Sequence, residues 1–121
     1  MPFAPSIMVE HVADYFAQPI EEPFMTMAFD ILPGKEKDIQ AAIHLDNTAR
    51  PNTVNQKTNP LYWQVINAFY QKTGVPVILN TSFNRHGLPI VNSPKEAIEH
   101  LLWECIDELA IGNFFVKRKE E

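Results

Sequence analysis

Two helix starts built on proline bracket a short apolar strand, and this alternation constrains the fold more than any other feature. Asn59-Pro60 is typical of a helix N-cap and first position, and Gly74 stands where a C-terminal glycine cap belongs. Ser93-Pro94-Lys95-Glu96 is a capping box with proline at the first helical position. Between the helices, residues 77–79 have the composition of a buried strand. The alternation predicts an α/β fold, with α+β as the alternative.

The first third of the chain predicts smaller elements. Ser6 is expected to cap an amphipathic helix over residues 7–16. Residues 24–32 have strand composition, and Pro33-Gly34 ends that strand as a turn. Residues 35–42 are expected to hold a short helical turn.

In the last two thirds, apolar spacing predicts which helix faces are buried. The helix that starts at Pro60 carries a stripe of Leu61, Val65, Ile66 and Phe69. The helix that starts at Pro94 carries Ala97, Ile98, Leu101, Leu102 and Cys105, so the cysteine is expected in the core. The segment "ELAIGNFFVKR" predicts a final strand. Residues 76–117 would then form a strand–helix–strand unit.

Size and charge limit the class of protein. The 121 residues suffice for a single domain, expected to span 1–121. The net charge of −5 disfavours nucleic acids and anionic membranes as partners, and Lys117-Arg118-Lys119 is interpreted as a solvated tail. The single cysteine excludes an internal disulfide and a multi-cysteine zinc site, which fits the cytoplasm. No apolar run has the length of a membrane span.

Polar side chains follow the apolar strand directly. In a strand that continued past residue 79, Asn80, Ser82 and Asn84 would face the same side. Amides and a hydroxyl at the carboxyl end of a strand suit a phosphate, a carbonyl or the edge of a nucleotide. The same residue types also satisfy backbone groups in turns, and the spacing leaves both interpretations open.

A second polar segment, "HLDNTARPNT", contains His44, Asp46 and Arg50. Arginine is the natural bidentate partner of a phosphate. His44 and Asp46 have no third ligand beside them, so no metal site is predicted. A surface loop made of ordinary turn residues is the alternative.

These segments belong to a longer pattern. "PFAPSI", "PFMT", "HLDNTARPNTV", "TGVPVILNTSFNRHGLPIV" and "LAIGNFFVK" occur in this order and cover nearly the whole chain. The sequence resembles the C-terminal, YrdC-like domain of the nodulation-type O-carbamoyltransferases. The resemblance implies part of a YrdC-like twisted sheet with packed helices.

The resemblance also implies an activity and its partners. In this family an N-terminal domain of the actin-like ATPase type transfers a carbamoyl group to a hydroxyl acceptor. That domain is expected to hold the metal of the transfer step. The YrdC-like domain uses carbamoyl phosphate and ATP, the latter with Mg²⁺, to make carbamoyl-adenylate.

By the same resemblance, six residues are expected to bind carbamoyl phosphate and ATP. Ser82 and Asn84 form the Ser-x-Asn signature, and the remaining four are Met25, Thr26, Arg50 and Asn80. No residue is assigned to catalysis itself.

The chain also departs from the family pattern. The family has a Lys/Arg element just before "PFAPS", whereas here that position is Met1. Asn47 replaces the usual glycine, Asn52 the usual glutamine and Leu88 a common glutamate. We therefore expect a fragment with a partial site that is inactive alone. The alternatives are an RNA-binding module, disfavoured by the acidic charge, and a non-catalytic interaction domain, with a homodimer left open.

Overall fold

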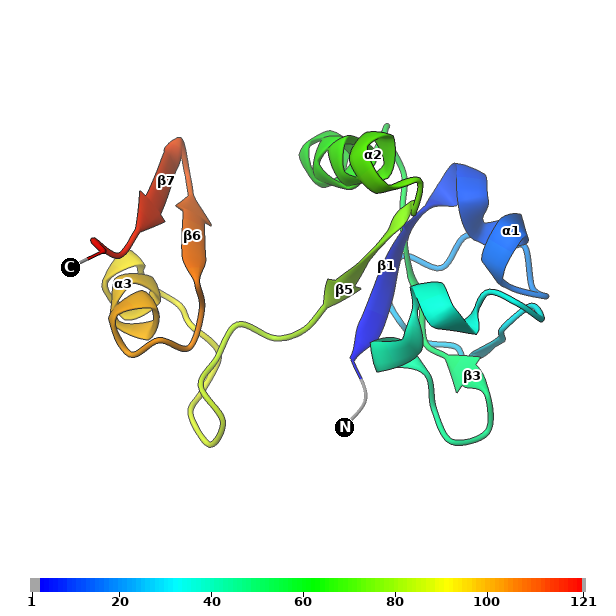
Figure 1. The fold of residues 1–121 in the computed structure, drawn as a ribbon, viewed down its shortest axis with the longest axis horizontal. Helices are drawn as coiled ribbons and strands as arrows, with labels where there is room; N and C mark the ends of the chain where they lie inside the picture. Colours follow the sequence, from blue (N-terminus) through cyan, green and yellow to red (C-terminus); the bar gives the residue numbers. More distant parts are fainter. Residues whose placement is uncertain (1–2, 121) are drawn as a thin grey trace. The chain divides into compact units, whose positions relative to one another are not determined.

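The computed structural model describes residues 3–120, which divide after Thr81 into two compact units. Figure 1 traces both units along the chain. Each unit combines strands with helices, which confirms the α/β class. The expectation of one domain over residues 1–121 stays a prediction. None of the helices within residues 3–120 is both long and apolar enough to cross a membrane.

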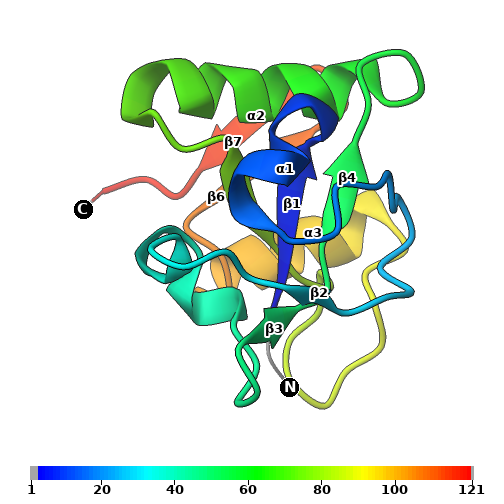
Figure 2. The ribbon, with the colours of Figure 1, turned by 90° about the vertical axis from the view of Figure 1, so that its right-hand side faces the viewer.

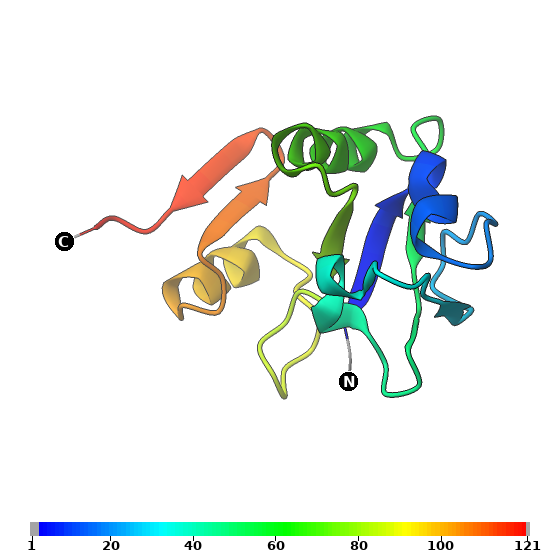
Figure 3. The same cartoon turned by 45° about the vertical axis from the view of Figure 1, so that its right-hand side comes forward.

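The first unit is built on a three-stranded sheet in the order β4-β1-β5. The central strand β1 (Ala4–Met8) lies between the two others, as Figure 3 shows in blue. It runs parallel to β4 (Asn52–Val54) and antiparallel to β5 (Val77–Asn80). A separate antiparallel pair joins β2 (Phe29–Asp30) to β3 (Thr48–Ala49).

Short helical segments and one long helix complete this unit. The short ones are η1 (Val9–His11), α1 (Val12–Tyr15), η2 (Glu36–Asp38) and η3 (Gln40–Ala42). The last two confirm the helical turn expected over residues 35–42. The long helix α2 (Pro60–Thr73) starts on proline and ends at Gly74, whose φ of 75° is left-handed. Both ends of α2 were therefore correctly predicted.

The helix predicted over residues 7–16 is wrong at its start. Ile7 and Met8 belong to β1, and η1 and α1 follow only from Val9. Ile7 packs in a cluster with Phe16 and Phe29, whereas Met8 packs with Val54 and Ile66. Successive side chains thus enter cores on opposite faces, which is the alternation of a central strand covered on both sides.

The strand predicted over residues 24–32 is mostly wrong as well, because only Phe29 and Asp30 form a strand, and Ile31 adds an isolated bridge to Phe16. The preceding residues form an irregular loop. The carboxylate of Glu22 accepts hydrogen bonds from the backbone N–H groups of Phe24 and Thr26. These bonds curl the backbone away from an extended course.

The stripe predicted on α2 is only partly buried. Ile66 is fully buried, but Leu61, Val65 and Phe69 are exposed by 74%, 54% and 42%. The aromatic face of the helix is the one that packs, through Tyr62, Trp63 and Tyr70. Two hydrogen bonds fix this orientation: Tyr62 Oη donates to Ser6 Oγ at 2.7 Å, and Trp63 Nε1 donates to Glu10 at 3.1 Å.

The second unit packs α3 (Pro94–Leu102) against a hairpin of β6 (Glu108–Ile111) and β7 (Phe114–Lys117) (Figure 3). Ser93 Oγ accepts a hydrogen bond from the Glu96 N–H at 3.2 Å, which confirms the predicted cap. Its core consists of Ala97, Leu101 and Leu109, with five side chains packed around them: Phe83, Val91, Ile106, Ile111 and Val116.

Two predictions about chain pairing are wrong here. The single final strand is a hairpin, because Gly112 takes a left-handed φ of 57° and turns the chain. β5 and β6 also belong to different sheets, so residues 76–117 do not form a strand–helix–strand unit of one sheet. β6 pairs with β7 across a tight turn as an antiparallel hairpin, which needs no crossover connection, whereas a parallel pair would require one.

Four assignments of burial or exposure in this unit also need correction. Ile98, Leu102 and Cys105 are exposed, the last because α3 ends before it, at Leu102. The basic run is not simply a solvated tail. Lys117 lies in β7 and pairs with Glu108 at 3.0 Å. Arg118 Nη1 donates to the carbonyl oxygens of Leu101 and Ile106, each at 2.8 Å, and so caps the end of α3.

Candidate functional site

Arg50 and Asn80 lie at the same end of the three-stranded sheet. Asn80 pairs with Ala4 at the start of β1, and Asn52 pairs with Ser6 on the other side of β1. Arg50 precedes Asn52 by two residues, so it reaches the level of Ala4. The two predicted ligands therefore flank the start of β1, although they are 30 residues apart in sequence.

Arg50 is exposed on a backbone that is held on both sides. Its neighbours Ala49 and Pro51 are fully buried, so the main chain is anchored while the side chain points out. Three ion pairs occur within residues 3–120, and none includes Arg50: they are His11–Asp14, Lys95–Glu99 and Lys117–Glu108. The guanidinium is thus available to an anion, which it can bind through two parallel hydrogen bonds.

The loop that carries Met25 and Thr26 is organised by a carboxylate. Glu22 is 9% exposed, and its N–H donates to Thr53 Oγ1 at 2.8 Å. Its Oε1 accepts from the N–H groups of Phe24 and Thr26, at 3.1 and 3.2 Å. Hydrogen bonds from Thr26, its backbone N–H first, hold the pKa of Glu22 below its ordinary value. Met25 takes a left-handed φ of 56° within this loop.

A chain of hydrogen bonds ties the same loop to the sheet. Tyr62 Oη donates to Ser6 Oγ at 2.7 Å, and Ser6 Oγ donates to Asn52 Oδ1 at 3.0 Å. Asn52 Nδ2 then donates to the carbonyl of Pro23 at 2.6 Å. Ser6 is fully buried, so this chain of hydrogen bonds crosses the interior of the first unit. Helix α2 and the loop of Met25 and Thr26 are thereby coupled.

Ser82 and Asn84 lie in the second unit and outside any strand, because β5 ends at Asn80. The predicted common face of residues 80, 82 and 84 is therefore wrong. Ser82 Oγ donates to Asn84 Oδ1, and Asn84 Nδ2 donates to the carbonyls of Arg85 and Leu88 at 3.2 and 3.1 Å. These bonds match the turn interpretation that the sequence left open. A binding role for the two residues stays a prediction.

Between Ser82 and Asn84, Phe83 anchors the segment. Its side chain packs against the core of the second unit, with its ring centroid 5.5 Å from that of His100. The Phe83 carbonyl also accepts a hydrogen bond from the Val91 N–H at 2.8 Å. The apolar side chain is thus fixed, while the two polar neighbours remain at the surface of this unit.

A compact cluster precedes Arg50. Thr48 Oγ1 donates to Asp46 Oδ1 at 2.7 Å and lies 3.2 Å from His44 Nδ1. Hydrogen bonds from Thr48, first from its hydroxyl, hold the pKa of Asp46 below its ordinary value. Figure 2 shows the loop before β3 at the end of the sheet where β1 begins. No three His, Cys, Asp or Glu side chains gather as a metal site in the described part of the chain.

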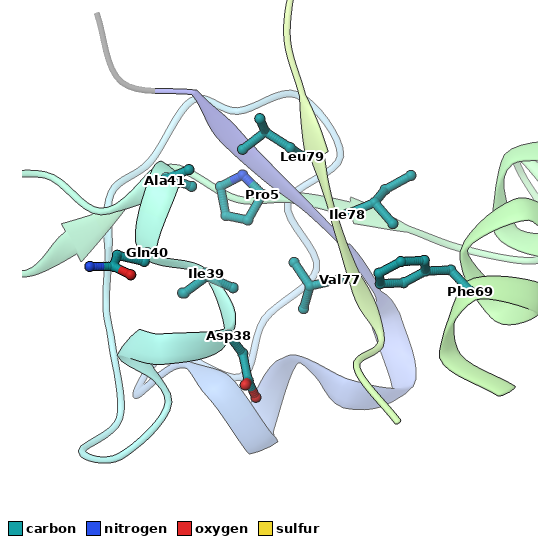
Figure 4. Close-up of a pocket in the computed structure, with 10 residues that line it drawn as sticks. Pro5, Asp38, Ile39, Gln40, Ala41, Phe69, Val77, Ile78 and Leu79 are labelled. Carbon is teal, nitrogen blue, oxygen red and sulfur yellow. The ribbon is translucent and has the colours of Figure 1, made fainter. Parts of the chain in front are cut away.

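An open apolar cavity of about 330 Å³ lies along β1 and β5 in the first unit (Figure 4). Its lining includes Pro5, Ile39, Phe69, Val77 and Leu79, and Asp38 is its only charged residue. Tyr15 Oη donates to that carboxylate at 2.9 Å; burial first, then this contact, raises the pKa of Tyr15. None of the six predicted ligands lines the cavity, and a lone carboxylate does not suit a phosphate.

Two organising residues escaped sequence reasoning. Glu22 and Thr48 act through hydrogen bonds to nearby backbone and side chains, and neither forms part of a recognisable spacing. The capping pattern of Ser, Thr or Asp before a helix was not available as a signal, because neither residue begins a helix. One signal was available in the sequence, because Asn47 stands where the family usually has glycine. The structure gives Asn47 a left-handed φ of 62°.

The carbamoyltransferase C-terminus family matches residues 1–118, and the chain belongs to this family. A protein from Methanocaldococcus jannaschii is 42% identical over 98% of the chain, and nodulation protein NolO from Bradyrhizobium diazoefficiens is also 42% identical over 98%. The 3′-hydroxymethylcephem-O-carbamoyltransferase of Streptomyces clavuligerus is 28% identical over 97%. The chain spans only 23%, 22% and 22% of the lengths of these three proteins.

Proposed function

We propose that the chain is the part of an O-carbamoyltransferase that binds carbamoyl phosphate and Mg²⁺-ATP and forms carbamoyl-adenylate. The family match supports carbamoyl transfer, and a relative is named as an O-carbamoyltransferase acting on a hydroxymethyl group. One observation carries the binding proposal. Arg50 presents a guanidinium without an ion-pair partner in the described chain, at the end of the sheet where Asn80 also lies.

In this proposal each residue contributes through its own chemistry. Arg50 binds a phosphate group through two hydrogen bonds and offsets its charge. The amide of Asn80 orients an oxygen on the other side of β1. Thr26 and Met25, held in place by Glu22, line the nucleotide. Ser82 and Asn84 are proposed as further ligands on the strength of the resemblance alone. The chain has a net charge of −5 and cannot neutralise the phosphates of ATP by itself, so Mg²⁺ supplied with ATP does so.

The geometry of β1 supports the proposal that the site is completed by residues upstream. The Lys/Arg element of the family stands just before "PFAPS", and β1 begins at Ala4. Such an element would therefore meet the sheet at the end where Arg50 and Asn80 lie. Several anionic groups must be neutralised in adenylate formation, and Arg50 alone is one positive charge. We infer that the chain by itself binds weakly and has little activity.

Transfer to the hydroxyl acceptor requires a second domain in this proposal. The actin-like, metal-containing domain would be the partner, and the chain spans about a fifth of the length of its relatives. A cytoplasmic location and a homodimer remain predictions of the sequence.

Calorimetric titration with carbamoyl phosphate and with Mg²⁺-ATP tests the binding proposal. Arg50→Gln is expected to weaken binding at least about tenfold, because a charged bidentate contact is lost. Lys72→Gln is the matched control, since it removes a positive charge from the exposed last turn of α2. Equal weakening by both variants, or by neither, would overturn the assignment of Arg50.

A further inference from the structure

The sequence pairs His44 with Asp46, and the proposed function leaves this pair without a role. The structure joins the two side chains through a third, the hydroxyl of Thr48. Thr48 Oγ1 lies 2.7 Å from Asp46 Oδ1 and 3.2 Å from His44 Nδ1. Each atom of this relay has a definite hydrogen-bonding role, because a hydroxyl has only one proton to donate.

The direction of the hydrogen bonds follows from that single proton. Asp46 is an acceptor, since the bonds from Thr48 favour its ionised form and lower its pKa. The Thr48 hydroxyl therefore donates to Asp46 and accepts from His44. Nδ1 of His44 must carry a proton, so Nε2 of the neutral ring has a free lone pair. No hydrogen bond to Nε2 occurs within residues 3–120, and the ring is half-buried.

The relay is held on a stiff loop. The His44 N–H donates to the Thr48 carbonyl at 2.7 Å, and the Asn47 N–H donates to the His44 carbonyl at 3.0 Å. Thr48 itself begins β3 and pairs with Asp30 in β2. The imidazole is thus oriented both by its backbone and through its Nδ1 atom, as preorganised catalytic groups are.

The relay and Arg50 share one side of the chain. Ala49 is fully buried, so Thr48 and Arg50, which flank it, point away from the core. Two residues along an extended backbone span about 7 Å. A phosphate group bound by Arg50 would therefore lie close to the histidine that Thr48 orients.

We propose that His44 is a catalytic residue of carbamoyl-adenylate formation and that its Nε2 accepts a proton from the water that attacks carbamoyl phosphate. The inference rests on the proposed function and adds a proton acceptor to it. Thr48 and Asp46 are positioning residues, because they act through the imidazole.

Carbamoyl-adenylate then forms in two steps. A water oxygen adds to the carbamoyl carbon while Nε2 of His44 takes one water proton. The bond between that carbon and the phosphate oxygen breaks, and phosphate leaves. The His44 imidazolium passes its proton to the departing phosphate, the carbamic acid releases the second proton to solvent, and the resulting carbamate oxygen attacks the α-phosphorus of ATP. Pyrophosphate departs, leaving carbamoyl-adenylate. Arg50 holds the phosphate that leaves, and His44 serves the water.

Histidine-selective ¹⁵N NMR of the chain tests the geometry without requiring turnover. The free chain should show His44 protonated at Nδ1, and carbamoyl phosphate should shift its Nε2 resonance. Thr48→Val should abolish the tautomer preference, and Arg50→Gln should abolish the shift. His11 is the internal control, since it lies in η1, after the end of β1 opposite to Ala4, and should not respond.

The outcomes separate the two proposals. Binding that shifts the Arg50 amide but leaves His44 Nε2 unchanged would overturn the role of His44 and leave the proposed function intact. No binding of carbamoyl phosphate or Mg²⁺-ATP would overturn the proposed function, and the inference with it.

The chemistry is tested by steady-state kinetics. The enzyme to use is the longer carbamoyltransferase of which we propose this chain is a part. His44→Asn keeps a donor toward Thr48 but has no base, so kcat for phosphate release should fall about 100-fold or more with KM little changed. Thr48→Ser should retain most activity and Thr48→Val should not. An unchanged kcat in His44→Asn would refute the proposal.

Discussion

Replacing Thr53 by valine should lower the free energy of unfolding of the first unit, because it removes one buried hydrogen bond. Thr53 is 2% exposed, and its Oγ1 accepts the Glu22 N–H at 2.8 Å. Valine has nearly the same shape, so no cavity forms, but the Glu22 N–H loses its partner. A buried donor without a partner costs about 1–3 kcal/mol. The loop that carries Met25 and Thr26 should loosen at the same time.

The chain offers a separate fluorophore for each unit. Trp63 packs in the first unit and Trp103 lies in the second, so a Trp103→Phe background makes the fluorescence specific for the first unit. Urea unfolding in this background should give a free energy of unfolding lower by about 1–3 kcal/mol for Thr53→Val. Thr58→Val is the matched control, because Thr58 is exposed, and should change it by at most about 0.5 kcal/mol. Equal values for the two variants would refute the reasoning.

Three further perturbations test other parts of the fold. Ile66→Ala should lower the free energy of unfolding by about 2–5 kcal/mol, whereas Leu61→Ala, on the exposed stripe of the same helix, should change it by at most about 0.5 kcal/mol; equal effects would contradict the observed packing of α2. Arg118→Gln should destabilise the second unit by about 1.5–3 kcal/mol, read from Trp103 fluorescence, because two carbonyls lose a charged donor. The lowered pKa of Glu22 means that the unfolded chain binds its proton more readily, so stability should fall as the pH drops below about 4.5. Glu22→Gln should flatten that fall, and an unchanged pH profile would contradict the role of this carboxylate.

Local signals accounted for the parts of the fold that were predicted correctly. The starts of α2 and α3 depend on residues within one turn, so Pro60 and the Ser93 cap were visible in the sequence. The assignment of Ile7 and Met8 to a strand depends on β4 and β5, whose paired residues are 46 or more positions away. Periodicity over ten residues could not reveal those partners.

The candidate site was likewise predicted in part: its residues were expected from the sequence, but their arrangement was not. Arg50 and Asn80 were expected from motif resemblance, but only the register of β1 with its two neighbours brings them to one end of the sheet. Their spacing of 30 residues gave no such indication. The strand alternation assumed for Ser82 failed because β5 ends at Asn80, two residues earlier. Strand ends are set by pairing with other strands, which a short apolar run does not encode.

A backbone amide NMR titration with carbamoyl phosphate, followed by Mg²⁺-ATP, tests the central claim most directly. The account predicts saturable shifts at Arg50 and Asn80 with carbamoyl phosphate, and additional shifts at Met25 and Thr26 with the nucleotide. Residues that line the apolar cavity away from the strand end, such as Ile39 and Phe69, should stay unchanged. No saturable shift at Arg50 or Asn80, or shifts confined to the cavity, would contradict the assignment of the carbamoyl phosphate site to this end of the sheet.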